Sequence, residues 1–238
     1  MIKLIGFDLD NTLWPVKPVI LYAESELQKH LGGLSPAIPY SGAHLSTYRS
    51  EILKENPDFA FRLTDLRRAM LVKIAMEVPA HRAHAEAVAD TAMAVFLKAR
   101  NAVAYYPGAE AALQELSENY ALCALTNGNA SVEQLSIGPL FSFALTAEQV
   151  GAPKPKPDIF VAALDHFGCK PEEMIYVGDD PLLDITASAS LGIFTIWLSD
   201  RGTVSAESAT PATEIIYDLS DLTAAVKRIN ERFGMPPQ

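Results

Sequence analysis

The sequence predicts an α/β fold, a Rossmann-like doubly wound parallel sheet into which a helical segment is inserted. Two observations predict the sheet: short, continuous apolar runs recur along the chain, and helical patterns separate them. The third observation is a long stretch of helical periodicity with little strand signal, which follows the first apolar run. The 238 residues allow one large domain, or one domain with a sizeable insert.

The predicted strands are runs in which apolar residues follow one another without alternation, as expected for strands buried on both faces of a parallel sheet. They cover residues 2–7, 120–125, 174–177, 193–198 and, more weakly, 215–217. The helices predicted between and after them cover residues 109–118, 158–167, 183–191 and 219–232. Strand and helix in alternation are typical of an open, doubly wound sheet.

The insert interrupts this alternation with apolar residues at helical spacing, beginning with Leu21, Leu27 and Leu31. The pairs Trp14-Pro15 and Pro107-Gly108 punctuate its two ends. We therefore expect an α/β core domain formed by residues 1–16 and 103–238, and a helical domain formed by residues 17–102. Helices placed beside the end of a parallel sheet would close a site against water.

Composition and charge restrict the class of protein. Hydrophobic residues make up 49% and charged residues 20% of the chain, which is typical of a globular protein. The net charge of −10 predicts no general affinity for nucleic acid. A small phosphorylated metabolite stays compatible, because one metal ion or lysine can reverse the field inside a cleft. The acidic surface is compatible with a monomer or a homodimer.

The cellular setting is predicted from what the chain contains. No run approaches the roughly 18 uncharged apolar residues of a membrane-spanning helix, so we expect no membrane partner. Cys123 lies in an apolar run and Cys169 in a loop-like stretch. Two cysteines in such different settings favour a reducing compartment, hence the cytoplasm.

Two aspartates follow the first predicted strand, where ligands bind in open α/β sheets. Asp8 and Asp10 are two residues apart, and Thr12 follows at the same spacing. Two neighbouring carboxylates repel each other, and either a divalent cation or an acid–base partnership would account for their coexistence. The alternative is an exposed acidic turn.

A second acidic group follows the strand predicted at residues 174–177. Asp179 and Asp180 come directly after Gly178, and Asp184 lies near the start of the next helix. Oxygen ligands from two strand ends can share a hard cation such as Mg²⁺. The alternative is a turn with an aspartate capping the helix.

Two further segments offer groups for an anion. Thr126, Asn127 and Gly128 follow the second strand, and their hydroxyl, amide and backbone N–H groups can cradle a phosphate, although Asn-Gly is also a common turn. Lys154 and Lys156 lie in a proline-rich segment before a predicted helix and can supply a fixed positive charge. The alternative for that segment is a rigid, solvated loop.

The four segments together resemble the motifs of the haloacid dehalogenase-like (HAD) superfamily. The pattern extends over essentially the whole chain and reads Asp8-x-Asp10-x-Thr12, Thr126-Asn127, Lys154-Pro-x-Pro, and Gly178-Asp179 with Asp184 four residues beyond Asp180. The insert looks like the helical cap of subclass I of that superfamily. The resemblance implies a Mg²⁺-dependent enzyme that hydrolyses a small phosphate monoester.

The resemblance also implies a role for each residue. Asp8 would be the nucleophile that forms an aspartyl-phosphate, and Asp10 would protonate the leaving alcohol and then activate water. Lys154 would balance charge, with Lys156 as the alternative if the loop register differs. The other implied groups are the phosphate ligands Thr126, Asn127 and Gly128, the Mg²⁺ ligands Asp8, Asp10 through its backbone carbonyl and Asp179, and the supporting Thr12, Asp180 and Asp184.

Several functions remain open within the superfamily. The acid at position 10 favours a phosphatase over a dehalogenase, because the superfamily's dehalogenases lack that acid and need no metal. The core segments are similar to bacterial phosphatases of flavin mononucleotide and of a phosphorylated riboflavin precursor, and Trp14 is a candidate to stack on such a ring. A sugar phosphomutase resembling β-phosphoglucomutase and a non-catalytic binding protein on the same scaffold are the alternatives.

Overall fold

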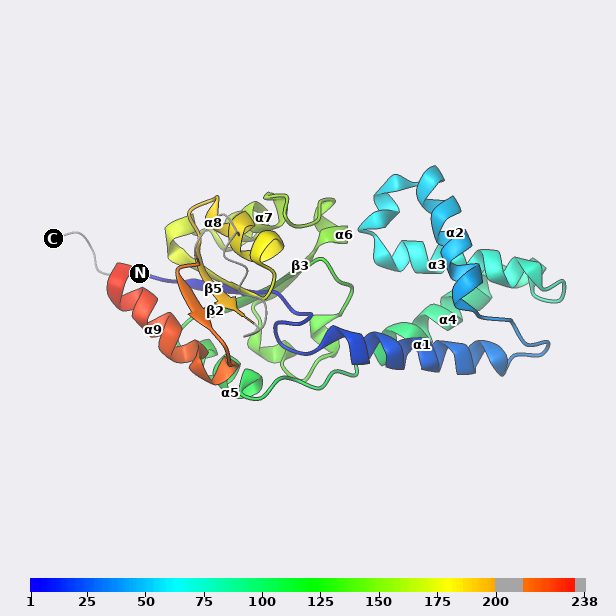
Figure 1. Ribbon diagram of the computed structural model, residues 1–238, viewed down its shortest axis with the longest axis horizontal. Helices are drawn as coiled ribbons and strands as arrows, with labels where there is room; N and C mark the ends of the chain where they lie inside the picture. The colour runs from blue at the N-terminus through cyan, green and yellow to red at the C-terminus, as the bar shows by residue number, and fades with distance from the viewer. Residues whose placement is uncertain (200–211, 234–238) are drawn as a thin grey trace. The chain divides into compact units, whose positions relative to one another are not determined.

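The structure, a computed structural model, describes residues 1–199 and 212–233. The chain divides into two compact units, one formed by Met1–Pro15 with Ala104–Gln238 and the other by Val16–Val103. The first unit contains a parallel sheet with helices on both faces, and the second is helical (Figure 1).

All strands of the sheet are parallel. Within the described residues there are six, in the order β3-β2-β1-β4-β5-β6. Their bounds are β1 Leu4–Phe7, β2 Ala121–Thr126, β3 Phe143–Thr146, β4 Met174–Gly178, β5 Phe194–Leu198 and β6 Glu214–Ile216. The order reverses beside β1, so a ligand crevice is expected beyond the carboxyl ends of β1 and its neighbours. This arrangement confirms the predicted doubly wound α/β fold.

Helices cover both faces of the sheet. Figure 1 shows α7 (Asp158–Phe167) and α8 (Ala187–Ala189) on one face and α5 (Ala109–Ser117) and α9 (Leu222–Phe233) on the other, while the short α6 (Ala147–Val150) follows β3. All four residues of the central strand β1 are buried. Gly6 leaves room there, because a Cβ atom would lie 2.9 Å from a ring carbon of Tyr176 in β4.

Two elements differ from the sequence prediction. Strand β3 was not predicted, because its four residues form a half-buried edge strand without a long apolar run. The helix predicted at residues 183–191 is instead a π-helical turn, Pro181–Thr186, followed by the short α8. Pro181 at its start lacks an N–H, and Asp184 and Ile185 both donate their backbone N–H to the Asp180 oxygen, which widens the turn.

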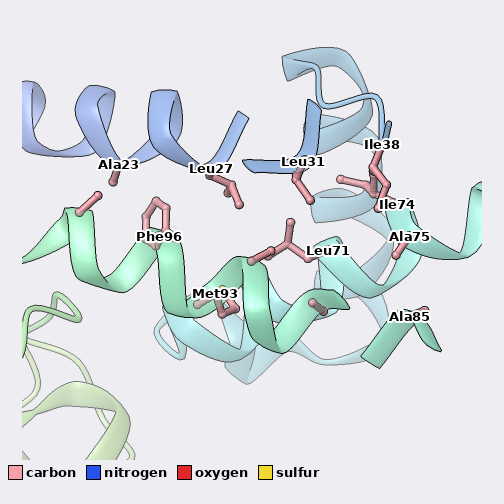
Figure 2. Packing of buried hydrophobic residues seen from close by; sticks show 13 residues of the cluster. Ala23, Leu27, Leu31, Ile38, Leu71, Ile74, Ala75, Ala85, Met93 and Phe96 are labelled. Atoms are coloured by element: carbon pink, nitrogen blue, oxygen red, sulfur yellow. The ribbon is translucent and has the colours of Figure 1, made fainter. Parts of the chain in front are cut away.

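The helical unit contains α1 (Val16–Gly32), α2 (Gly42–Glu55), α3 (Leu63–Glu77) and α4 (Ala85–Arg100). Its core is mostly aliphatic and alanine-rich, and Leu27 and Leu31 of α1, Leu71 of α3 and the aromatic Phe96 of α4 belong to one cluster (Figure 2). Residues four apart on α1 line one face, as expected for an amphipathic helix. In the part of the chain that the structure describes, no helix is both long and apolar enough to cross a membrane.

A polar group is built into this helical unit. The Arg67 guanidinium of α3 lies 2.7 Å from Glu24 and donates a 3.2 Å hydrogen bond to the Tyr40 hydroxyl. Tyr40 donates in turn to Glu24 at 2.6 Å. The Arg67 guanidinium also stacks on the Phe96 ring, 3.8 Å from its centroid. We name Arg67, Glu24, Tyr40 and Phe96 the arginine cluster.

Candidate active site

The loop that leaves β1 brings the first two aspartates to the carboxyl edge of the sheet. Asp8 is buried, and its backbone N–H donates to Val177 of β4 at 2.9 Å. Asn11 then takes a left-handed conformation, with φ of 63°, and donates its N–H to the Trp14 oxygen at 2.7 Å. Asparagine tolerates this conformation better than most residues, so the loop can turn sharply and hold Asp10 close to Asp8.

Lys154 lies at the centre of the candidate site. It is only 4% exposed, and its Nζ donates to Asp8 Oδ1 and to Asp184 Oδ1, each at 2.6 Å. The same nitrogen lies 2.9 Å from the Tyr176 hydroxyl and 3.1 Å from the Leu125 carbonyl oxygen. Buried charges need partners of this kind, because an unpaired ammonium would lose its hydration without compensation. We name Lys154, Asp8, Asp184 and Tyr176 the lysine cluster.

Asn127 holds the segment that carries Lys154. Its side-chain amide donates to the Lys154 carbonyl oxygen at 3.0 Å and accepts from the Lys154 backbone N–H at 2.8 Å. Thr126 is buried at the end of β2, and its hydroxyl accepts from the Gly128 N–H at 2.9 Å. The loop after β2 is therefore bound to the lysine segment through both atoms of one amide.

The aspartates of the loop after β4 make different contacts. The Asp180 carboxylate caps the π-helical turn, accepting from the N–H groups of Leu182 and Leu183 at 2.8 Å. Asp184 is buried and accepts from the Asp180 N–H at 3.0 Å as well as from Lys154. Gly178 permits this approach, since a Cβ atom there would lie 2.5 Å from the Asp184 carboxyl carbon.

Thr12 joins the two acidic loops. Its hydroxyl lies 3.0 Å from Asp179 Oδ1 and 3.3 Å from Asp8 Oδ2. One hydroxyl proton serves one acceptor at a time, and the shorter distance favours Asp179. Asp179 is held from the other side as well, because the Trp197 indole N–H donates to its backbone oxygen at 2.8 Å.

These residues surround a cavity of about 170 Å³. Its lining includes most of the candidate site residues predicted from the sequence, namely Asp8, Asp10, Thr126, Asn127, Gly128, Lys154, Asp179, Asp180 and Asp184. Asn11 and Leu183 also line it. A second cavity of about 700 Å³ shares Asn11, Asp179 and Asp180 with it. Residues from the ends of three neighbouring strands therefore meet around one small polar space.

The electrostatics of the cavity show an excess of negative charge. Burial raises the pKa of Asp179 to about 7, helped by the nearby charges of Asp8 and Asp184. Burial and Asp8 likewise raise the pKa of Asp184 to about 6, against the opposing effect of Lys154. Burial also raises the pKa of Asp8, against the same lysine. For Lys154 itself, burial opposes the charged form, but Asp8 and Asp184 together raise its pKa.

The donor set fits a divalent metal ion. Asp8, Asp179 and Asp184 each offer a carboxylate oxygen, and the three oxygens lie within 4.8 Å of one another. Three carboxylates beside one lysine leave two negative charges uncompensated, which a hard divalent cation would neutralise. Both oxygens of Asp184 accept hydrogen bonds, one from Lys154 and one from the Asp180 N–H. Asp8 also pairs with Lys154, through Oδ1, and the Asp179 carboxylate accepts from Thr12.

The structure also separates residues that the sequence grouped together. The Asp10 carboxylate is not in the three-carboxylate group; its Oδ1 accepts from the Trp14 indole at 2.9 Å. Lys156 is exposed, whereas Lys154 is buried against Asp8. The carboxylate of Asp180 is used as a helix cap.

Sequence reasoning missed Tyr176, whose hydroxyl donates to the Leu125 oxygen at 2.9 Å and accepts from Lys154. A signal for it exists. Tyrosine within a continuous apolar strand carries a hydroxyl that must find a partner when buried, and here it is fully buried.

Comparison with known proteins finds relatives over most of the chain. A 5-amino-6-(5-phospho-D-ribitylamino)uracil phosphatase, YigB of Escherichia coli, is 28% identical over 198 residues, 83% of each chain. A glyceraldehyde 3-phosphate phosphatase of Methanopyrus kandleri is 30% identical, over 82% of this chain and 83% of the relative.

The chain also superposes on a solved structure over nearly its whole length. The crystal structure of a 2-haloacid dehalogenase from Pseudomonas syringae pv. Tomato DC3000 superposes with a TM-score of 0.90 and 34% identity, covering 96% of this chain and 99% of the other. The sequence profile of the haloacid dehalogenase-like hydrolases matches residues 2–192. With its four motifs gathered around one cavity at the carboxyl edge of a doubly wound sheet, the chain belongs to the haloacid dehalogenase-like hydrolase family.

Proposed function

We propose that the protein is a Mg²⁺-dependent phosphatase that hydrolyses a small phosphate monoester through an aspartyl-phosphate on Asp8. The observation that carries this proposal is the position of Asp8 at the end of the central strand, 2.6 Å from the Lys154 ammonium and beside Asp10 in one polar cavity. A carboxylate nucleophile, a cation and a second carboxyl group are the minimum set for two-step phosphoryl transfer.

In the first step an Asp8 carboxylate oxygen attacks phosphorus as the bond from phosphorus to the ester oxygen breaks. Asp10 gives its proton to that oxygen, so the alcohol leaves neutral. Lys154 pairs with Asp8 Oδ1, which leaves Oδ2 as the attacking atom and lowers the repulsion between nucleophile and phosphate.

In the second step water attacks the aspartyl-phosphate. Asp10 takes a proton from the water as the bond from phosphorus to Asp8 breaks, which releases inorganic phosphate and restores both carboxyl groups. Thr126, Asn127 and Gly128 line the same cavity, and this loop would hold the phosphate oxygens in both steps.

The metal ion belongs to this proposal. Asp8, Asp179 and the backbone carbonyl of Asp10 would hold Mg²⁺, with Asp184, Asp180 and Thr12 in support. When bound, Mg²⁺ supplies neutralisation of the excess negative charge and of the phosphate oxygens. The raised pKa of Asp179 supports the assignment, because burial and the neighbouring carboxylates disfavour its charged form and a bound cation would favour it.

The substrate is proposed as a small phosphorylated metabolite of the cytoplasm, with residues 17–102 serving as the family's cap domain. The likeness to YigB supports a phosphorylated riboflavin precursor or flavin mononucleotide as the first choice. The relative in Methanopyrus kandleri makes a phosphorylated triose the second.

One observation favours a different reaction. The structure with 34% identity is a 2-haloacid dehalogenase, and Asp8 could displace a halide from carbon as well as an alcohol from phosphorus. The acid at position 10 and the three clustered carboxylates support the phosphatase, because a halide leaves without a proton and needs no metal ion.

The test is release of inorganic phosphate and of chloride by one preparation of the purified protein. The phosphate panel contains flavin mononucleotide, 5-amino-6-(5-phospho-D-ribitylamino)uracil, glyceraldehyde 3-phosphate, a hexose phosphate and 4-nitrophenyl phosphate, each with Mg²⁺ or with EDTA. The chloride arm uses 2-chloropropionate.

Asp8→Asn is the inactive control, and Asp165→Asn, an exposed aspartate on α7, is the matched control. Phosphate release that needs Mg²⁺, vanishes in Asp8→Asn and persists in Asp165→Asn establishes the phosphatase. Chloride release without phosphate release shows the dehalogenase instead. A conversion of hexose phosphate isomers without net phosphate release shows a mutase.

A further inference from the structure

Trp14 lies at the end of the loop that carries the two catalytic aspartates, and the structure gives it a different surrounding from the one expected. Its side chain is fully buried, so the hypothesis that the ring stacks on a substrate is wrong. The ring packs edge-on against Tyr105, with centroids 5.9 Å apart and planes at 69°. A buried tryptophan is restricted in its motion, and any group bonded to it is restricted too.

The indole nitrogen of Trp14 is bonded to Asp10. Its Nε1–H has one proton to donate and no lone pair to accept with, and it donates to Asp10 Oδ1 at 2.9 Å. Burial makes this bond costly to break, because the N–H would then have no partner in an apolar surrounding. Asp10 is half-buried and is one of the residues that line the 170 Å³ cavity.

The backbone reinforces the same pairing. Asp10 and Trp14 form an isolated β-bridge, and Asn11 donates its N–H to the Trp14 oxygen at 2.7 Å. Tyr106 donates its N–H to Leu13 at 2.8 Å, which ties the loop to the chain segment that carries Tyr105. The bond between the indole and the carboxylate therefore closes a loop that several backbone contacts already hold in place.

We infer that Trp14 is a positioning residue that holds the carboxyl group of Asp10 in one orientation through the bond from its indole N–H to Oδ1. A carboxyl group that is free to turn about its Cβ–Cγ bond presents either oxygen. A donor fixed on Oδ1 opposes this rotation, so the carboxyl group keeps the same orientation when it transfers its proton. This inference rests on the proposed phosphatase.

The experiment exploits the dependence of proton transfer on the leaving group. An alkyl phosphate such as flavin mononucleotide needs a proton on its leaving oxygen, whereas 4-nitrophenyl phosphate releases 4-nitrophenolate, which is a stable anion. The ratio kcat/KM reports events up to alcohol release, so the water-activating step does not enter. In Trp14→Phe we expect kcat/KM for the alkyl ester to fall about 30-fold, part of the typical contribution of an acid catalyst, and for 4-nitrophenyl phosphate about threefold or less.

A double-mutant cycle shows whether Trp14 acts through Asp10. In the Asp10→Asn background, Trp14→Phe is expected to change kcat/KM for the alkyl ester less than threefold, because the group it positions is already disabled. Trp197→Phe is the matched control. That tryptophan donates its N–H to the Asp179 backbone oxygen, and its loss should affect both esters alike.

A second variant covers the case in which Trp14→Phe does not fold. Replacing the Trp14 side chain by 3-benzothienylalanine puts sulfur in place of Nε1–H and keeps the shape of the ring, and the same selective loss is expected. An equal loss for both esters, or full additivity with Asp10→Asn, would overturn the role of Trp14 and leave the phosphatase intact. A wild-type protein that releases no phosphate from either ester overturns the proposed function, and this inference with it.

Discussion

The lysine cluster and the arginine cluster each place one cation beside a carboxylate, yet their charges balance differently. Arg67 meets one carboxylate, Glu24, and its remaining contacts are the Tyr40 hydroxyl and the Phe96 ring. Lys154 pairs with both Asp8 and Asp184. A carboxylate oxygen of Asp179 lies within 4.8 Å of a carboxylate oxygen of each of these two aspartates. The arginine cluster is neutral and complete, whereas the lysine cluster together with Asp179 has two negative charges in excess.

This difference separates a structural ion pair from a candidate active site. A complete network stabilises the fold and gives no reason for a ligand to bind. Excess negative charge in a buried site lowers the stability of the metal-free protein, and a bound cation removes this cost. Carboxyl groups with perturbed pKa values are therefore common at functional sites. The following four predictions test whether the two clusters divide their roles in this way.

The largest effect is expected from Lys154→Met. Removing the ammonium leaves Asp8 and Asp184 buried without their cation, and the loss of such a partner costs about 3–5 kcal/mol of stability. We expect kcat to fall about 10³-fold or more, since charge stabilisation is usually the largest catalytic contribution. Thermal unfolding and phosphate release measure the two effects.

Lys156→Met is the matched control, because Lys156 lies in the same segment and is exposed. Lys156→Met should leave both the stability and kcat nearly unchanged. Near-normal turnover in Lys154→Met would contradict the proposed role of the lysine cluster.

The second prediction concerns pH. The pKa of Asp179 is raised to about 7 and that of Asp184 to about 6, from an ordinary value of 3.8. Between pH 4 and pH 7 the folded metal-free protein therefore holds protons that the unfolded chain has lost. Their contribution makes the free energy of unfolding fall as pH rises through this window. Denaturant titrations in EDTA measure the slope.

Two comparisons isolate the aspartates. Asp179→Asn should flatten the decline with pH, because the variant has no carboxyl group to titrate at that position. Mg²⁺ should raise the unfolding temperature more at pH 7.5 than at pH 5, where it must displace protons from its ligands. A metal-free protein whose stability rises steadily from pH 4 to pH 7, equally in Asp179→Asn, would show that excess charge is absent.

A smaller effect is expected in the helical unit from Arg67→Met. The variant loses an ion pair with a side chain that is 29% exposed and the stacking on Phe96, which together are worth about 1–3 kcal/mol. We expect the free energy of unfolding to fall by that amount while kcat changes about twofold at most. A large loss of kcat with unchanged stability would mean that the arginine cluster takes part in catalysis.

The smallest effect is expected from Tyr176→Phe. The variant removes one hydroxyl that accepts from Lys154 and keeps the ring, which packs edge-on against Phe160 at 4.9 Å. Lys154 keeps its bonds to Asp8 and Asp184, so we expect the free energy of unfolding to fall by about 0.5–1.5 kcal/mol, the net value of a typical hydrogen bond, and kcat to fall by no more than about twofold. Steady-state kinetics and thermal unfolding measure both.

The elements that could be predicted from the sequence are those with long apolar runs, which are also the most buried. The central strands were predicted because strands buried on both faces must be apolar throughout, as β1 and β4 are. Strand β3 was not predicted, because an edge strand buries only part of each side chain and needs no apolar run. The π-helical turn at Pro181–Thr186 was not predicted, because the periodicity of apolar residues does not record that the Ile185 N–H bonds to the Asp180 oxygen, five residues earlier.

The sequence alone determined the family of this protein, because four short motifs in order identify the residues that converge at the carboxyl edge of a doubly wound sheet. Only the tertiary structure decided how these residues divide their work. It placed Lys154 rather than Lys156 against Asp8, turned Asp10 toward Trp14, and joined Tyr176 to the lysine. The physical reason is that a motif specifies which groups are present, whereas burial and hydrogen-bond geometry, which depend on distant segments, decide which partner each group finds.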